Sequence, residues 1–539
     1  MAEQYYEVPE EDISLLYPHA GLAGDGGDAE LTELTCEQLE LGCLLDLKSC
    51  DIQSFYTCDT DTILYRQATF SDMKEVPELS PVLSKMIPFL NDITELRRLG
   101  TGDSSENYLY SIAEVELYTS LMEILKDELL PLAPRLRSPA FIKFAERINT
   151  LTKSEYYRDI NDRLKELTSR VREIKSVTIG VNLDSAMRAE KAGVISVNNE
   201  PFRSGDLLNK MLRLDFKKDD MTCIAPLVPF KKGQTENSQT ALANAFNGAL
   251  TDIYRQSVKS WKNVVRHYVL DNTDFLLRMM PEIEFVTKAS ELINRLESVG
   301  CGLTVPGIRP MHEKAFKAAG LRNPVVAVKL ETATVPNDFE FDEKGMIYVL
   351  TGPNRGGKSV LTCAVGLAFV MAQLGLPVAA DRCEISPVDR IFTHFPQGGE
   401  DTIDKGRLGE ECSRLSQIFD EVTEYSLVLL DESLSSTGSY EGAYIAAEVL
   451  EGFSMARCRG IFSTHLHDLA AATDSINSAC LPKGGVPVDN LVADISGGER
   501  TFRILREKPD GRSYAKDIAD RYGLSIEKIL GKIKKNGEI

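Results

Sequence analysis

A glycine-rich stretch of the sequence ends in a lysine and a serine, residue types that bind phosphate and magnesium. It fits the pattern GxxxxGK[ST] and consists of Gly352, Pro353, Asn354, Arg355, Gly356, Gly357, Lys358 and Ser359, followed by Val360. Glycines let backbone N–H groups turn inward around phosphate oxygens, and the N-terminus of a following helix adds partial positive charge. We therefore predict an ATP-binding loop here, in which Lys358 reaches the β and γ phosphates and Ser359 ligates Mg²⁺.

A second stretch places two carboxylates directly after an apolar run. Asp431 and Glu432 follow Leu427-Val428-Leu429-Leu430. A buried strand of this kind delivers its last side chains to the carboxyl edge of a parallel sheet, where ligands bind. We predict that Asp431 holds Mg²⁺ through water and that Glu432 is the catalytic carboxylate, which orients or deprotonates the attacking water.

A histidine ends a third apolar run. His465 follows Ser463 and Thr464, so it can lie beside the same crevice and sense or polarise the γ-phosphate. The alternative is a surface or capping histidine. The spacing of His465 and His467 also suggests metal binding, but no further Cys, His or carboxylate cluster completes a zinc set.

These residues need a sheet to position them, and the sequence from Asn323 onward alternates strand and helix patterns. MIYVLTG (346–352), PVAAD (377–381), YSLVLLDE (425–432) and GIFSTH (460–465) are the predicted strands. Such alternation predicts a mostly parallel sheet covered by helices. The apolar stretch from Cys363 to Ala380 is interrupted by Gln373 and Pro377, so a buried helix leading into a strand explains it better than a membrane span.

The preceding sequence is mainly helical, and the predicted fold is multidomain. We predict a flexible acidic arm over 1–30, then a mainly helical region over 31–322 with a small β insertion at about 176–200, including one extended helix over 141–175. An α/β P-loop NTPase domain of the ABC-like type, with C-terminal helices, follows over 323–539. The glycines of ISGGE (495–499) are interpreted as a hairpin turn rather than an ABC signature, because they follow the acidic strand.

Several motifs together resemble the ATPase domain of the MutS family. TGPNRGGKSV, LVLLDESLSSTGSYEG and IFSTHLHDLA occur in the family's order, with VPND upstream and GRSYAKDIADRYGLSIEKIL near the end. The resemblance implies a homodimer through the ATPase domains, with composite ATP sites coupled to lever helices that close around DNA. It supports the roles given above to Lys358, Ser359, Asp431, Glu432 and His465, and it places Ser435 to Ser439 in a loop that faces the partner's site.

The sequence also departs from the family pattern. The loop that usually offers a serine across the dimer here reads Asp404 to Glu411, with Gly406 or a neighbour in place of the serine. Backbone N–H groups of Gly406 to Gly409, with Arg407, could substitute for it. The family has an aromatic residue that stacks on adenine just before VPND, and this position holds Thr334 or Val335 here. The resemblance implies a member without the N-terminal mismatch-recognition and connector domains.

Charge and cysteine usage narrow the function further. The 539-residue chain has a net charge of −20, and residues 1–110 hold 22 acidic and 6 basic side chains, which argues against a uniformly basic DNA-binding surface. Eleven cysteines without a CxxC pair, and an N-terminus without an apolar core, favour the reducing cytoplasm. Cys36, Cys43 and Cys50 are seven residues apart and could share one helix face as buried small side chains.

Two hypotheses for the function follow. The first is a MutS-like ATPase that clamps double-stranded or branched DNA, with contacts from basic residues such as Arg158, Arg163, Lys165, Arg170 and Arg172. Acidic residues are interleaved among these, so a solvated helix face is an alternative role for them. The second is an ATP-driven regulatory dimer whose helical arms bind a protein partner. Neither involves a membrane.

Overall fold

The computed structural model describes most of the chain apart from its N-terminal and C-terminal segments and a large central stretch. The described ranges are 13–19, 29–46, 49–99, 107–164 except 156, 159 and 163, 176–183, 185, 189–198, 203–204, 222–223, 274–396, 406–434, 438–496, 499–508, 523–524, 526 and 528–530. The chain divides into two compact units. The first contains 1–13, 81–136 and 142–280, and the second contains 14–80, 137–141 and 281–539.

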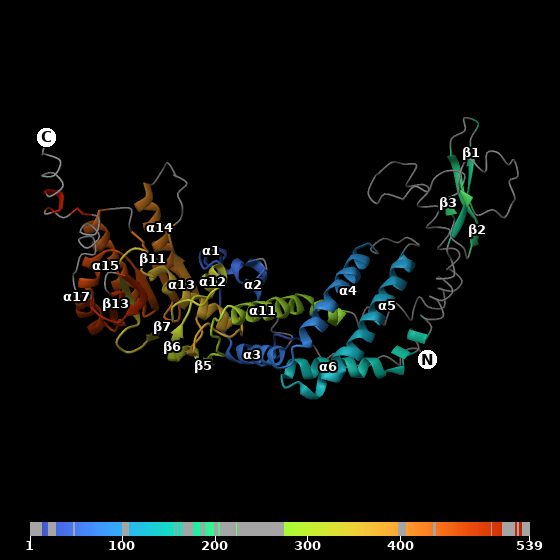
Figure 1. Cartoon of the computed structure of the whole chain (residues 1–539), viewed down its shortest axis with the longest axis horizontal. Coiled ribbons are helices and arrows are strands. Elements are labelled where there is room, and N and C mark those ends of the chain that lie inside the picture. Colours follow the sequence, from blue (N-terminus) through green and yellow to red (C-terminus); the bar gives the residue numbers. More distant parts are fainter. Residues whose placement is uncertain are drawn as a thin grey trace. The chain divides into compact units, whose positions relative to one another are not determined.

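The first unit is built from long helices and a small β hairpin, as predicted. Helices α4 (Leu79–Leu99) and α5 (Asn107–Ile124) lie side by side (Figure 1), linked by an ion pair of 2.7 Å between Arg97 and Glu114. Helix α5 continues into the π-helical segment η3 (Leu125–Leu129) and then the 3₁₀ helix η4 (Leu130–Arg135). Strands β1 (Ser176–Leu183) and β2 (Ala189–Asn198) pair antiparallel and confirm the β insertion. The short strands β3 (Arg203–Ser204) and β4 (Thr222–Cys223) pair in parallel.

The predicted extended helix over 141–175 is interrupted. Helix α6 (Pro139–Lys153) ends at Ser154, whose hydroxyl donates to the carbonyl of Leu151 (2.8 Å) and accepts from the N–H of Tyr157 (3.1 Å). A serine side chain that bonds the local backbone in this way competes with helical hydrogen bonding. The described residues from 155 to 164 return to helix, and residues 165–175 lie outside the described part of the chain.

The second unit contains a six-stranded sheet in the order β10-β11-β12-β8-β13-β14. Its strands are β8 (Ile347–Thr351), β10 (Ile391–His394), β11 (Leu427–Asp431), β12 (Arg459–Ser463), β13 (Val488–Ser496) and β14 (Glu499–Leu505). All neighbours are parallel except β13 and β14, which pair antiparallel, as the interpretation of ISGGE as a hairpin turn predicts. The two glycines at 497–498 lie outside the described residues. Every residue of β8, β11 and β12 is buried, which requires helices on both faces.

Helices cover the two faces of this sheet separately. Helix α13 (Lys358–Gln373) packs on the face that carries Leu429, where a Cβ on Gly366 would lie 2.6 Å from the Leu429 side chain. The opposite face carries Val428 and Leu430 and packs against α14 (Gly406–Glu421), α15 (Ser439–Ala456), α16 (His467–Ala471) and α17 (Thr473–Cys480). This confirms the predicted parallel sheet between helical layers.

A smaller sheet in the order β5-β9-β6-β7 packs beside the first. Its strands are β5 (Gly307–Ile308), β6 (Phe316–Leu321), β7 (Asn337–Phe341) and β9 (Arg382–Ile385), so it includes strands on both sides of residue 323. Phe316 stacks on Phe369 of α13 at a ring-centroid distance of 4.8 Å, which attaches this sheet to the phosphate-loop helix. Helix α12 (Pro324–Leu330) lies between β6 and β7 in the chain.

The predicted strand PVAAD (377–381) is wrong. The strand begins at Arg382, and Val378 pairs only with Thr304 in an isolated bridge. Pro377 has no N–H to donate, and the N–H of Ala380 bonds the carbonyl of Val378, so the chain turns here instead of extending. The apolar character of the stretch reflects burial, since Val378, Ala379 and Ala380 are each 1% exposed.

The prediction of a loose arm over 1–30 is wrong for residues 14–17, which are buried. The carboxylate of Glu282, on α11 (Met280–Ser298), accepts hydrogen bonds from the Ser14 hydroxyl (2.8 Å) and from the N–H groups of Leu15 (2.6 Å) and Leu16 (3.2 Å). The fully buried guanidinium of Arg66, on α3 (Thr60–Glu75), donates to the carbonyl of Leu16 (3.1 Å). Burial of these polar groups is tolerated because they are hydrogen-bonded.

The three cysteines do not share a helix face. Cys36 lies in α1 (Glu33–Gln38), Cys43 in the 3₁₀ turn η2 (Leu41–Cys43) and Cys50 in α2 (Ser49–Phe55). Glu40 adopts a left-handed conformation (φ 55°) that breaks the helix between the first two. Among the described residues, no helix is long and apolar enough to cross a membrane.

Candidate nucleotide site

The glycine-rich loop connects the end of β8 to the start of α13, as predicted. Gly352 (φ 140°) and Gly357 (φ 97°) adopt backbone conformations that favour glycine. A Cβ on Gly352 would lie 2.6 Å from the Cβ of Ala493 on β13, so a larger residue would push the loop off the sheet. Arg355 (φ 63°) and Asn354 are exposed at the tip of the loop.

Lys358 is the first residue of α13, and its side chain lies within the loop. Its Nζ donates to the carbonyls of Gly352 (3.0 Å) and Pro353 (3.4 Å), and the residue is 4% exposed. Burial lowers the pKa of Lys358, while the nearby carboxylates of Glu432 and Asp431 act in the opposite direction. The structure thus brings Lys358 and the acidic pair together. Ser359 and Val360 follow, exposed at the start of the helix.

Four adjacent strands end in buried polar side chains at the same edge of the sheet. Within the described residues, one polar atom of each has no hydrogen-bond partner: Thr351 Oγ1 on β8, Asp431 Oδ1 on β11, Ser463 Oγ on β12 and His394 Nε2 on β10. Unpartnered buried polar atoms are costly, and their concentration at the carboxyl edge indicates a ligand site.

The donors present fit magnesium better than zinc. In the described ranges, no group of three or more His, Cys, Asp or Glu side chains could hold a metal ion by itself. His465 and His467 are therefore not part of such a group. Mg²⁺ is usually bound through one or two carboxylates together with phosphate oxygens. Asp431 and the exposed Ser359 supply oxygen ligands of that kind beside the phosphate loop.

Glu432 leaves β11 in a strained turn. Its φ is 47° and that of Leu434 is 62°, both in the left-handed region, and Ser433 lies between them. The N–H of Glu432 donates to the carbonyl of Ser463 (2.8 Å), and its side chain is half-buried. Strain of this type often occurs at functional turns.

His465 lies where the end of β12 meets β8. Thr464 donates its N–H to the carbonyl of Leu350 (2.9 Å), which fixes the residue before the histidine. His465 itself is exposed, as is His467 at the start of α16. The structure therefore brings His465 to the same edge of the sheet, with its ring open to solvent.

Sequence reasoning missed a cluster of exposed apolar side chains beside the phosphate loop. Phe502 on β14 is 47% exposed, and its Cα lies 3.7 Å from the place of a Cβ on Gly357. The amide group of Asn337 donates to the carbonyls of Phe502 (3.2 Å) and Val335 (3.4 Å), which holds these two segments together. Phe502 was not predicted because it reaches the loop through a bulge in the hairpin, with φ 58°.

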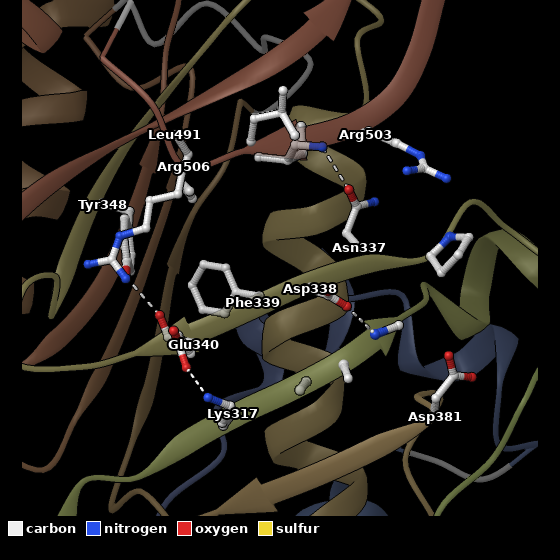
Figure 2. Close-up of a pocket in the computed structure, with 16 residues that line it drawn as sticks. Lys317, Asn337, Asp338, Phe339, Glu340, Tyr348, Asp381, Leu491, Arg503 and Arg506 are labelled. Carbon is white, nitrogen blue, oxygen red and sulfur yellow. Dashed lines mark hydrogen bonds and ion pairs between the residues drawn. The ribbon is translucent and has the colours of Figure 1, made fainter.

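A cavity of about 650 Å³ lies between β7 and β14 (Figure 2), but none of the phosphate-loop residues lines it. Most of its charged groups are already paired: Lys317 with Glu340, Arg506 with Asp342 and Asp489, Asp381 with Arg322, and Asp338 with the N–H of Gly320. Arg503 also lines it and has no ion-pair partner among the described residues. The cavity is therefore distinct from the phosphate site.

The segments predicted to face a partner subunit are described only in part. Gly406 to Gly409 form the first turn of α14 and not a loop, so that expectation is corrected, although the first N–H groups of a helix remain free to donate. Residues 404–405 and 435–437 lie outside the described part of the chain. Neither Thr334 nor Val335 is aromatic, so neither can stack a ring on the base.

A phosphate loop after a central parallel strand, with an acidic residue at the end of a nearby strand, defines a P-loop nucleotide-binding domain. Two family models match the chain: MutS domain V over residues 348–529 and the MutS2 N-terminal domain over residues 58–299. The chain belongs to the MutS family.

Curated relatives have the same affiliation. The Endonuclease MutS2 of Thermus thermophilus is 34% identical over 195 residues, which cover 36% of this chain and 25% of the relative. The DNA mismatch repair protein MutS of Roseiflexus sp. is 40% identical over 170 residues, 30% of this chain and 16% of the relative. The Endonuclease MutS2 of Streptococcus gordonii is 28% identical over 301 residues, 52% of this chain and 36% of the relative. The chain therefore spans well under half the length of these relatives.

Proposed function

We propose that this chain binds and hydrolyses ATP at the edge of the six-stranded sheet. The observation that carries the proposal is the convergence of Lys358, Asp431 and Glu432 beside a glycine-rich loop, since the two carboxylates act electrostatically on the lysine. Backbone N–H groups of the loop and the ammonium of Lys358 would hold the phosphates. Phosphoryl transfer depends mainly on such positioning and charge stabilisation.

The carboxylates and His465 would perform the hydrolytic step. Ser359 and Asp431 would hold Mg²⁺, which when bound neutralises charge on the phosphate oxygens. Glu432, at the exit of β11, would orient the attacking water and accept its proton. His465 would donate a hydrogen bond to the γ-phosphate from the neighbouring strand end, and its exposure leaves it free to do so.

The adenine base would lie on Phe502. Its exposed ring beside Gly357, with Val335 and Val360 also about 40% exposed nearby, forms an apolar surface next to the phosphate loop. Asn323 is 4% exposed, and its side-chain amide donates to the carbonyl of Val360 (3.0 Å). The backbone N–H of Asn323 donates to the Thr334 hydroxyl (3.2 Å). These contacts fix the surface, which compensates for the missing aromatic residue at 334–335.

We further propose that two chains pair through their ATPase domains and that ATP state controls a clamp on double-stranded or branched DNA. The family affiliation and the names of relatives, which include DNA mismatch repair proteins, support this function. Of the basic lever residues considered above, Arg158 is exposed and donates to the carbonyl of Lys153 (3.1 Å), whereas Arg163, Lys165, Arg170 and Arg172 lie outside the described residues.

The alternative is an ATP-driven dimer that grips a protein partner. The excess of acidic residues within 1–110 favours it, because such a surface repels DNA. ATP turnover measured at low salt with duplex, branched and single-stranded DNA separates the two. Stimulation that weakens with added salt supports the DNA clamp. Turnover that no DNA changes, together with no gel shift, favours the protein partner, and no turnover at all refutes the ATPase.

A further inference from the structure

The turn that carries Glu432 is held by a histidine on the neighbouring strand. His394 is the last residue of β10, and its Cα is opposite Leu430 of β11. Its Nδ1 lies 2.6 Å from the hydroxyl of Ser433, which also lies 3.1 Å from the carbonyl of His394. His394 is 2% exposed and Ser433 is 3% exposed, so water does not compete for these bonds.

The turn requires such an anchor because its backbone is strained. Glu432 and Leu434, on either side of Ser433, have φ values of 47° and 62°. Both conformations are unfavourable for a residue other than glycine, so they persist only where surrounding contacts fix them. Two contacts do so: the N–H of Glu432 on the carbonyl of Ser463, and the hydroxyl of Ser433 on His394.

The other side of the imidazole faces helix α14. Arg414, on this helix, is close enough to affect His394 electrostatically. Burial, together with Arg414, lowers the pKa of His394 to about 4, so the ring is neutral near pH 7 and carries one N–H. The hydrogen bond from the ring to Ser433 therefore anchors the exit of β11.

We propose that His394 is a positioning residue for ATP hydrolysis, which sets the carboxylate of Glu432 through the hydroxyl of Ser433. This inference rests on the proposed function. Among the described residues, His394 makes no side-chain hydrogen bond to the phosphate loop or to Glu432, and it acts by fixing the turn through Ser433. Its effect is on the hydrolytic step and not on nucleotide affinity.

Three substitutions distinguish the roles of the two ring nitrogens. His394→Asn places an amide group near the position of Nδ1 and keeps the bond to Ser433, whereas His394→Gln reaches only the position of Nε2, and His394→Phe keeps volume alone. We expect His394→Gln and His394→Phe to lower kcat about tenfold or more, with KM within about twofold, because small displacements of a catalytic group are costly. His394→Asn should stay within about threefold of wild type on the same reasoning.

A double-mutant cycle tests the route through Ser433. Ser433→Ala should lower kcat as much as His394→Phe, and the double variant should be no worse than either, because both remove one interaction. Additive losses would overturn the proposal. Thr393→Val is the matched control, since Thr393 is buried on the same strand, bonds Thr35 (3.3 Å) and does not contact the turn.

A readout that needs no turnover distinguishes failure of this inference from failure of the ATPase proposal. Amide hydrogen exchange of the nucleotide-free protein should be faster over 431–434 in His394→Gln and His394→Phe, and unchanged in His394→Asn and Thr393→Val. Unchanged exchange in all four would refute the positioning role even if wild-type ATPase activity is found. Faster exchange in His394→Gln and His394→Phe, together with a wild type that has no ATPase activity, would support the anchor and refute only the ATPase.

Discussion

The side-chain amide of Asn337 accepts a hydrogen bond from the N–H of Ile504 at 2.7 Å, across the gap between two separate sheets (Figure 2). Asn337 begins β7, an edge strand of the four-stranded sheet, and Ile504 lies on β14, an edge strand of the six-stranded sheet. The same amide donates to the carbonyl of Phe502. One side chain thereby fixes the position of the aromatic ring beside the phosphate loop.

Replacing Phe502 by alanine should weaken ATP binding without affecting phosphate binding. Stacking of a base on an aromatic ring contributes about 1–3 kcal/mol, so we expect roughly a tenfold loss of ATP affinity. Isothermal titration with ATP and with inorganic tripolyphosphate measures both. Leu505→Ala, an exposed neighbour on the same strand, is the control. Equal weakening of both ligands would place the base elsewhere.

Lys358→Ala should abolish ATP binding, because it removes the cation that contacts the phosphates. A fluorescent ATP analogue measures the loss, and the exposed Lys483→Ala serves as the control. Retained binding in Lys358→Ala would contradict the assignment of the loop.

Lys358 should also affect the stability of the nucleotide-free protein. Its pKa is lowered by burial from the ordinary value of 10.5, so between the two values the unfolded state binds more protons than the folded state. Stability then rises with pH across that window. Lys358→Met should remove this rise, as measured by urea unfolding at several pH values. An unchanged pH dependence would show that the ammonium is well solvated in the folded protein.

Glu432→Ala should leave ATP binding intact and stop turnover. Loss of a general base typically lowers rates by about a hundredfold to ten-thousandfold. Alanine in this left-handed position costs about as much as glutamate, so the fold is retained. We expect the ATP-bound variant to accumulate as a dimer in light scattering, with Glu448→Ala as an exposed control. Monomers that persist with ATP would count against a composite site at a dimer interface.

Arg506→Gln should destabilise the second unit in a pH-dependent manner. The guanidinium donates to Asp342 (2.8 Å) and Asp489 (2.7 Å), and its hydrogen bonds lower the pKa of Asp342 from 3.8 to about 2. The stabilisation is therefore present above pH 3.8 and is lost as pH falls towards 2. Near pH 7 we expect a loss of about 1–2 kcal/mol, measured by denaturant unfolding.

Arg503→Gln is the control for this change, since no ion-pair partner for Arg503 occurs among the described residues. If the difference in free energy of unfolding between Arg506→Gln and wild type stayed constant as pH fell through this window, an interaction other than that with Asp342 would have to account for it.

The phosphate loop and its sheet were predictable because each depends on contiguous sequence. The run before Gly352, the apolar helix after Lys358 and the acidic end of β11 carry their own patterns, and the structure has each in its expected order. Phe502 and His394 were not predictable, because their positions depend on strand order and on a bulge. Residues 14–17 are a short run, Ser-Leu-Leu-Tyr, within an acidic stretch that has few other core-forming residues. Their burial depends on distant partners such as Arg66 and Glu282, the latter more than 260 residues further along, which sequence patterns do not reveal.

The order of the sheet has a consequence for synthesis on the ribosome. Strand β8 is hydrogen-bonded on its two sides to β12 and β13, both of which are translated more than 100 residues after it. Residues 14–80 likewise belong to a unit whose remaining parts include 281–539. The nascent phosphate loop therefore emerges long before its supporting strands, and the apolar side chains of β8 stay exposed until β12 and β13 have been translated. Chaperone dependence during expression, and insolubility of chains truncated before β13, are the expected results.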